Sequence, residues 1–231
     1  MTKIIGIILI LACTLSSYSQ KIKLNNQEFE LINVKGSVTE FKGDKVLKIE
    51  RDLKALPFDT ARLGATVDEP TYARLANVDF ESGTIEVKVL SQIQNPSPFR
   101  FAQGFIGVAF RISDQDSAYE SIYLRPKVGR SDNQLFRNHT VQYYSYPNYK
   151  FDKLRKEEEG KYETAAPVNI NEWITMRIEV KGEKAELFLN GAKYSTMIVN
   201  KMKGSTTHGS IALWVDIGTI GYFKDLKVTR Q

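Results

Sequence analysis

The sequence predicts an all-β protein folded as a two-sheet jelly-roll sandwich. Apolar and polar residues alternate with period two in most segments, as in Glu172–Val180, where Ile174, Met176 and Ile178 share one parity. Glycine-bearing turns separate these segments at short spacing, and only one short segment has a helical pattern. Many short strands with little helix pack as a sandwich or a barrel, and alternation with one apolar face favours two stacked sheets.

The N-terminus has the pattern of an export signal. Lys3 precedes an apolar run from Ile4 to Leu15, and the small residues Ser17 and Ser19 precede Gln20. We therefore expect residues 1–20 to be a signal peptide and the protein to be secreted or periplasmic. A competing interpretation makes Cys13 the acylated cysteine of a lipoprotein, which would leave the chain lipid-anchored.

Residues 21–231 are expected to form a single jelly-roll domain, and their composition excludes several classes of function. Cys13 is the only cysteine in the chain, so disulfides, cysteine-ligated metals and a cysteine nucleophile are excluded after signal removal. The formal net charge of +5 falls to +4 when Lys3 leaves with the signal, and these mild, interspersed charges argue against nucleic acid as a partner. Asp114 and Asp116 are interpreted as a turn, and we expect no metal, no cofactor and no transmembrane segment in the mature chain.

The first half of the chain reads as a meander of short strands. Phe29–Glu50 contains two or three strands separated by glycine turns. Residues 51–70 form a long connection that Pro57 and Pro70 interrupt. Strands resume over Tyr72–Phe80 and Gly83–Leu90, and a proline-containing loop follows at residues 95–100.

The second half adds one helix and then returns to strands. The charged segment Lys153–Glu159 is the one place where a short helix is expected, and its charges read as a solvated face. Asn190-Gly191 is a strong hairpin signal after the strand Lys184–Leu189. Within Gly209–Ile217 the core parity is apolar, and the final strand lies within Gly218–Thr229.

Residues 104–149 alternate between an apolar face and a polar one. In Tyr119–Arg125, Ile122 and Leu124 point one way while Tyr123 and Arg125 point the other. The same rule sends Trp214 and Asp216 away from the core, and we expect the small residues Gly107 and Ala109 to form the floor of a site. The strand expected over residues 138–146 has no purely apolar face, so its register stays open.

Three motifs in the second half resemble a known superfamily. They are WITMRIEVKG from Trp173, AELFLNG from Ala185, and GSIALW from Gly209 followed by GYFKDLKV from Gly221. Together they look like the closing half of concanavalin A-like lectin/glucanase domains, and are similar to the laminin-G-like and 3-keto-disaccharide-hydrolase-type domains of secreted bacterial proteins. The resemblance implies a jelly roll whose concave sheet handles carbohydrate.

We therefore expect a carbohydrate-binding protein that acts on an extracellular oligo- or polysaccharide through its concave sheet. Aromatic rings would stack on sugar rings, while arginine and amide side chains would bind hydroxyl groups. The expected ligand-binding residues are Tyr123, Arg125, Asn138, Gln142, Tyr144, Trp214 and Asp216. The alternative for the aromatic residues is that they only cover the outer face of a sheet, and for Arg125 that it forms a structural ion pair.

A second hypothesis is a glycoside hydrolase of the 3-keto-disaccharide-hydrolase type. Glu120 and His139 are the candidate catalytic residues, and Asp216 and Glu163 are further ionisable candidates. The superfamily's E-x-D-x-x-E glucanase motif is incomplete here, since its nearest match, at Glu50 and Asp52, has Ala55 in the third position. Catalysis is therefore left open beside binding.

Overall fold

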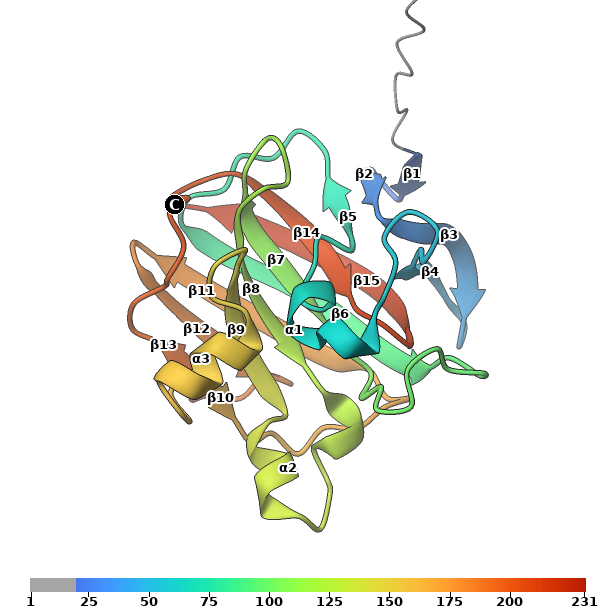
Figure 1. The fold of residues 1–231 in the computed structure, drawn as a ribbon. Coiled ribbons are helices and arrows are strands. Elements are labelled where there is room, and N and C mark those ends of the chain that lie inside the picture. The colour runs from blue at the N-terminus through green and yellow to red at the C-terminus, as the bar shows by residue number, and fades with distance from the viewer. Residues whose placement is uncertain (1–19) are drawn as a thin grey trace, which may run out of the picture.

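The computed structural model describes residues 20–231, so Cys13 and all of the expected signal peptide except Gln20 lie outside the described residues. The described residues form two antiparallel sheets of eight and seven strands (Figure 1). This confirms the predicted all-β jelly-roll sandwich. None of the helices in residues 20–231 has the length and apolar character needed to cross a membrane.

The eight-stranded sheet brings together segments from both ends of the chain. Its strands in spatial order are β1 (Lys21–Leu24), β2 (Gln27–Ile32), β5 (Tyr72–Leu75), β14 (Ser210–Val215), β7 (Ile106–Ile112), β8 (Tyr119–Leu124), β9 (Val141–Tyr146) and β10 (Glu163–Thr164). The four strands β14 to β9 in this order form the middle of the sheet and carry the candidate site.

The seven-stranded sheet lies on the other side of the core. Its order is β13 (Met197–Val199), β12 (Lys184–Leu189), β11 (Ile174–Lys181), β6 (Gly83–Ile93), β15 (Thr219–Arg230), β4 (Asp44–Arg51) and β3 (Val34–Phe41). The twelve-residue strand β15 lies between β6 and β4 and pairs with both. The last strand of the chain is therefore an interior strand of this sheet and joins β6 to β4.

The inner faces of the two sheets form the hydrophobic core. Ile174, Met176 and Ile178 of β11 are fully buried, as their period-two pattern predicts, and Leu213 and Val215 of β14 are buried on the opposing sheet. Because successive residues of a strand alternate between faces, the outer face of the eight-stranded sheet receives Tyr123 and Trp214.

The helical content exceeds the prediction. The expected helix exists as α3 (Phe151–Glu157), but α1 (Leu63–Thr66), α2 (Gln134–Asn138) and the 3₁₀ turns η1 (Thr60–Arg62) and η2 (Pro126–Val128) are also present. The strand expected from Asn138 begins instead at Val141, because Asn138 is the last residue of α2. The Asn133 side chain caps α2 by accepting a hydrogen bond from the Phe136 amide, a local signal that the strand pattern obscured.

The Asn190-Gly191 turn occurs where it was predicted, although its hairpin is longer than two residues. Both residues have positive φ, and the Ala192 amide donates to the Leu189 carbonyl at 3.0 Å. Strands β12 and β13 pair antiparallel across this connection, with Leu187 opposite Met197. The two-residue signal therefore starts a longer loop between the paired strands.

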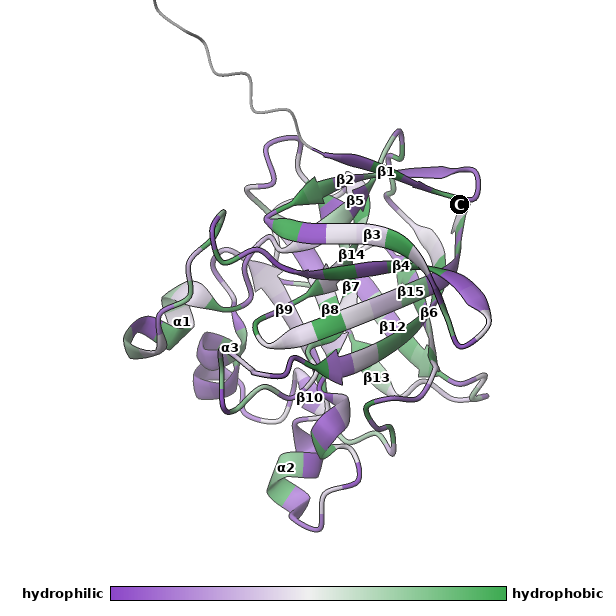
Figure 2. Ribbon diagram, turned by 90° about the vertical axis from the view of Figure 1, so that its right-hand side faces the viewer, coloured by the Kyte–Doolittle hydropathy of each residue, from purple (hydrophilic) through white to green (hydrophobic). Residues whose placement is uncertain are grey.

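A layer of irregular chain covers the outer face of the eight-stranded sheet. Residues 52–71, named here the capping segment, contain η1 and α1 but no strand. Figure 1 shows α1 and α3 in front of this sheet, and the turned view in Figure 2 shows both helices on the same side of the strands. These segments thus cover most of the outer face, and the space between them and the sheet is the candidate site.

Candidate functional site

A pocket of about 340 Å³ lies on the outer face of the eight-stranded sheet. The capping segment, the loop before β7, α2 and the start of α3 surround it, and β8 supplies part of its base. The residues lining it are Leu63, Val67, Asp68, Phe99, Phe101, Gln103, Phe105, Tyr123, Arg125, Leu135, Phe136, His139, Phe151, Arg155 and Asp216. Aromatic and charged side chains in one concave site are typical of small-molecule binding sites.

The strand register fixes which side chains reach this face. Tyr123 is the cross-strand partner of Gly107 and of Gln142, and Gly107 is in turn the partner of Trp214. Directly paired residues in an antiparallel sheet share a face. The register left open for residues 138–146 is therefore settled: Gln142 and Tyr144 face outward and Tyr143 faces the core.

Arg125 is held at the base of the pocket by four polar contacts. Its Nη2 donates to the Tyr123 hydroxyl at 2.6 Å and to Gln142 Oε1 at 3.2 Å. Its Nη1 donates to the His139 carbonyl at 2.7 Å and to Glu163 Oε1 at 3.2 Å. Arg125 is 4% exposed, and these contacts fix its guanidinium before any ligand arrives, which lowers the entropic cost of binding.

Glu163 joins Arg125, Arg155 and His139 into one cluster. Arg155 donates to both carboxylate oxygens of Glu163, at 2.5 and 2.9 Å, and His139 Nδ1 lies 3.0 Å from Oε2. Burial raises the pKa of Glu163, but the hydrogen bond from Arg155 and the charges of Arg125 and Arg155 outweigh burial and leave that pKa below its ordinary value. Burial lowers the pKa of His139, with Glu163 opposing it, so the imidazole at the pocket wall favours its neutral form.

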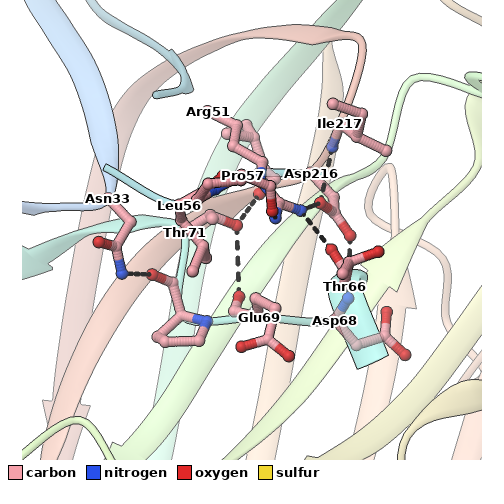
Figure 3. A network of polar contacts seen from close by, with 12 residues as sticks. Asn33, Arg51, Leu56, Pro57, Thr66, Asp68, Glu69, Thr71, Asp216 and Ile217 are labelled. Carbon is pink, nitrogen blue, oxygen red and sulfur yellow. Dashed lines mark hydrogen bonds and ion pairs between the residues drawn. The ribbon is translucent and has the colours of Figure 1, made fainter. Parts of the chain in front are cut away.

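A second cluster, drawn in Figure 3, joins Asp68 and Asp216 to Arg51. Asp216 Oδ1 accepts a hydrogen bond from Arg51 Nη1 at 2.8 Å, and Asp216 Oδ2 accepts one from the Asp68 amide at 2.9 Å. Arg51 also donates to the carbonyls of Leu56, Pro57 and Thr66, all in the capping segment. Arg51 and Asp216 therefore fasten this segment to the sheet beside the pocket.

Asp68 is the most perturbed carboxyl group in the pocket. Its side chain is buried and accepts a hydrogen bond from the Phe151 amide at 2.9 Å. Burial and, less strongly, the charge of Asp216 raise the pKa of Asp68 to about 7. Burial also raises the pKa of Asp216, against the opposing charge of Arg51. A carboxyl group with a pKa of about 7 can either give or take a proton at neutral pH.

The structure brings together four of the residues selected from the sequence. Tyr123, Arg125, His139 and Asp216 all line the pocket. Arg125 forms an ion pair, as the alternative predicts, but its partner is Glu163 and not Glu120 or Asp132, the partners expected from the sequence.

Gln142, Tyr144 and Trp214 face the same way as the pocket but are fully buried. Trp214 Nε1 donates to the Glu69 carbonyl of the capping segment, and its ring lies 4.9 Å from that of Tyr123 and 5.7 Å from that of Tyr144. The expectation that Trp214 and Arg125 lie outside the buried interior is therefore wrong, because the capping segment and α3 roof this face. The space that Gly107 was expected to leave open is also filled, because a Cβ at this position would lie 2.6 Å from the Cβ of Tyr123.

Glu120 and Asn138 lie away from the pocket. Glu120 shares the inner face of its strand with Ile122 and Leu124, and accepts hydrogen bonds from the Tyr143 hydroxyl at 2.6 Å and the Gly204 amide at 2.8 Å. It cannot face His139 across the pocket, so this candidate pairing is wrong. Asn138 is exposed at the end of α2, where its Oδ1 accepts a hydrogen bond from Gln134.

Arg51, Asp68 and the aromatic loop residues belong to the site but were not among the residues predicted from the sequence. Residues 51–70 were interpreted as a connection only. A connection of that length without a strand is itself a functional signal, because compact domains use mostly short loops. The apolar pair Leu135-Phe136 inside a polar stretch was a second available signal.

The comparisons with known proteins identify the family. Residues 79–229, more than half of the chain, match the model of the 3-keto-alpha-glucoside-1,2-lyase-like domain. The chain belongs to this family. The match confirms the resemblance stated from the sequence, and it begins after the capping segment, so Asp68 lies outside the matched residues. No match to the chain was found among the curated proteins.

Solved structures show the same fold at low sequence identity. The carbohydrate-binding module CBM66 from Bacillus subtilis is 10% identical, with 85% of this chain and 94% of that chain covered and a TM-score of 0.51. The β-glucanase of Bacillus licheniformis is 11% identical, with 92% of each chain covered and a TM-score of 0.46. A putative glycosyl hydrolase from Parabacteroides distasonis is 15% identical, covering 70% of this chain and 76% of that chain, with a TM-score of 0.44. At these identities only the likeness to the first carries weight, and it concerns the fold alone.

Proposed function

We propose that the chain binds a saccharide in the pocket on the outer face of the eight-stranded sheet, the face toward which strand alternation directs Tyr123 and Arg125. The observation that carries the proposal is the combination of aromatic walls with polar groups fixed in advance. Phe105, Phe151 and Tyr123 supply rings, and Arg125 is held by four contacts beside them. Sugars need both, because their C–H faces suit aromatic rings and their hydroxyls need hydrogen-bond partners.

The binding proposal is tested with the two histidines of the chain, which form a matched pair. His139 lines the pocket, whereas His208 lies in another loop, with a side chain 64% exposed. His139→Ala is expected to weaken saccharide binding by about tenfold or more, since a lost hydrogen bond to a polar ligand costs about 1.4 kcal/mol or more. His208→Ala is the control and leaves binding unchanged. Calorimetry against a panel of glucosides, 3-keto-α-glucosides and oligosaccharides gives the answer, and a folded wild-type protein that binds none of them contradicts the proposal.

We also propose that the protein acts outside the cytoplasm after removal of residues 1–20. The N-terminal pattern of Lys3, an apolar run and Ser19 supports this, and so does the family, which carries a carbohydrate-related name. N-terminal sequencing and intact-mass measurement of the exported protein test it. A lipid on Cys13 would replace this proposal by the anchored alternative, and retention of the whole segment would exclude both.

A second candidate function is elimination of the aglycone from a 3-keto-α-glucoside, the substrate class in the family's name. In such a sugar the C3 ketone acidifies the C2–H bond. A base removes the C2 proton, the electron pair forms a C1–C2 double bond, the C1–O bond breaks, and the departing oxygen takes a proton from an acid. The specific observation favouring this candidate is that the pocket holds a neutral-favouring His139 and the protonatable carboxyl group of Asp68.

The elimination hypothesis assigns His139 as the base and Asp68 as the acid. Asp68→Asn is expected to reduce release of phenol from phenyl 3-keto-α-glucoside by about a hundredfold or more while leaving ligand affinity within a few-fold, because general acid catalysis typically contributes 10²–10⁴ in rate. Asp59→Asn, at an exposed position, is the matched control. A wild-type protein that binds the glycoside without releasing the phenol rejects elimination and leaves the binding proposal in place.

A further inference from the structure

Charged and apolar side chains are distributed unevenly between the base and the mouth of the pocket. At the base, Asp68, Tyr123 and Asp216 are each 2% exposed and Arg125 is 4% exposed. At the mouth, three lining residues are exposed, and all three are apolar: Phe101 at 57%, Leu135 at 59% and Phe136 at 50%. The buried base of the pocket is therefore polar, and its solvent-exposed mouth is apolar.

These three side chains are half of the six exposed large apolar residues in the part of the chain that the structure describes. The others in residues 20–231 are Leu53, Tyr194 and Ile198, none of which lines the pocket. A side chain that leaves half its surface in water contributes little to the core, and a polar residue would serve equally well there for folding. Exposed apolar residues gathered at one opening mark a binding surface.

The mouth is held in place on both sides. On one side α2 is capped by Asn133, and the Arg137 side chain donates to the Ser131 carbonyl, so Leu135 and Phe136 are presented from a fixed turn of helix. On the other side the ring of Phe101 lies 5.7 Å from that of Phe99, and the Arg100 guanidinium lies 4.3 Å from its centre. Rigid apolar walls bind a ligand group at a lower entropic cost than mobile ones.

The chemistry of the mouth distinguishes between the groups that could occupy it. A second sugar ring can place its C–H face on Phe101 or Phe136, but these rings and Leu135 offer its hydroxyl groups none of the donors and acceptors that the base provides. An aromatic or other apolar group has no such need and gains from leaving water. The volume of about 340 Å³ is at the small end of ligand sites, which suits one sugar with one compact substituent better than a polymer.

We propose that the mouth formed by Phe101, Leu135 and Phe136 binds the apolar aglycone of a glycoside whose sugar occupies the polar base. This inference rests on the saccharide-binding function proposed above and narrows it from oligosaccharides to glycosides of apolar, chiefly aromatic, alcohols. The base then recognises the sugar and the mouth selects what is attached to it.

The test compares ligands that differ only in the aglycone. Calorimetry is performed with methyl and phenyl α-glucosides and with their 3-keto forms, using the wild type and a Leu135→Ser, Phe136→Ser double variant. The wild type is expected to bind the phenyl compound about tenfold more tightly than the methyl compound, by burial of the ring. In the double variant this preference falls to less than about twofold, because the phenyl ring loses the apolar side chains that bury it. The control is a Tyr194→Ser, Ile198→Ser variant, which alters exposed apolar residues outside the pocket and keeps the preference.

The outcomes separate the two proposals. Equal binding of phenyl and methyl compounds by the wild type overturns the aglycone inference and leaves saccharide binding intact. A disaccharide that binds more tightly than the phenyl glycoside does the same, because it assigns the mouth to a sugar. Binding of none of these glycosides overturns both proposals, and a thermal midpoint close to that of wild type confirms that the double variant is folded.

Discussion

The backbone amide of Asp68 donates a 2.9 Å hydrogen bond to Oδ2 of Asp216, which joins the capping segment to the end of β14. This contact brings a second carboxyl-bearing residue into a wall that is already buried. Arg51 Nη1 lies 2.8 Å from Asp216 Oδ1, so its positive charge stabilises the carboxylate of Asp216 directly. The effect of Arg51 on Asp68 is only indirect, through Asp216. The result is an asymmetric pair in which Asp68 holds its proton more firmly than an ordinary aspartic acid.

Asp68 is therefore expected to make the folded protein less stable as the pH rises. Its folded pKa of about 7 lies above the ordinary value of 3.8, so between these pH values the folded state binds the proton and the unfolded state releases it. Asp68→Asn should remove this dependence, and its stability relative to wild type should increase by a few kcal/mol, as an order of magnitude, from pH 4 to pH 8. Denaturant unfolding at both pH values measures the change.

Asp59→Asn serves as the control for this pH experiment. The hydrogen bond from Arg62 lowers the pKa of Asp59. The small contribution of Asp59 to stability therefore increases as the pH rises, whereas that of Asp68 decreases. If the unfolding free energies of Asp68→Asn and wild type change equally with pH, the carboxyl group of Asp68 is ionised throughout the range. Asp68 could not then be the proton donor.

Trp214→Ala is expected to destabilise the protein by about 3–5 kcal/mol, the range for removing a buried large aromatic side chain. Trp214 is fully buried, contacts the rings of Tyr123 and Tyr144, and donates to the Glu69 carbonyl. Tyr194→Ala, which alters a side chain 77% exposed, should change the unfolding free energy by less than about 0.5 kcal/mol. An unchanged thermal midpoint for Trp214→Ala would mean that this ring is a solvent-facing platform.

Glu163→Gln is expected to destabilise the protein strongly at pH 7, by about 3–5 kcal/mol, because it leaves Arg125 and Arg155 without their shared buried partner. The pKa of Glu163 is lowered in the folded state, so its stabilisation is fully present above the unfolded pKa of about 4.5 and is lost as the pH falls through the folded value. The difference between variant and wild type should therefore shrink below pH 4.5. Glu28→Gln, which breaks a pair that is largely in water, should have a much smaller effect at every pH.

Arg51→Lys is expected to loosen the capping segment while leaving the sandwich folded. Lysine keeps the charge beside Asp216 but cannot reproduce the planar fork that reaches the carbonyls of Leu56, Pro57 and Thr66. Trypsin should then cleave after Lys54 and Arg62 several-fold faster than in wild type, as mass spectrometry of the fragments would record. Arg130→Lys, which alters an exposed pair with Glu172, is the control. Equal cleavage rates for all three proteins would mean that the segment is held by other contacts.

The sequence predicted the direction of the site residues but not their exposure. Alternation is a local property of a strand, so the common face of Tyr123 and Trp214 follows from the residues themselves. Their burial depends on the capping segment, which is more than fifty residues away from either, and nothing in the pattern of β8 or β14 shows that it covers them. Glu120 illustrates the same limit, because its parity already placed it with Ile122 and Leu124, and only its residue type made it a candidate.

The position of β15 between β6 and β4 determines when the seven-stranded sheet can be completed during synthesis of the chain. β4 lacks its neighbour on one side until β15, more than 160 residues later in the chain, has been synthesised and docked. Contacts of such long sequence separation favour slow, all-or-none folding, and a partly synthesised chain exposes unpaired strand edges. We therefore expect nascent chains that end before β15 to stay open and to recruit chaperones or aggregate, a state compatible with threading an unfolded polypeptide through an export channel.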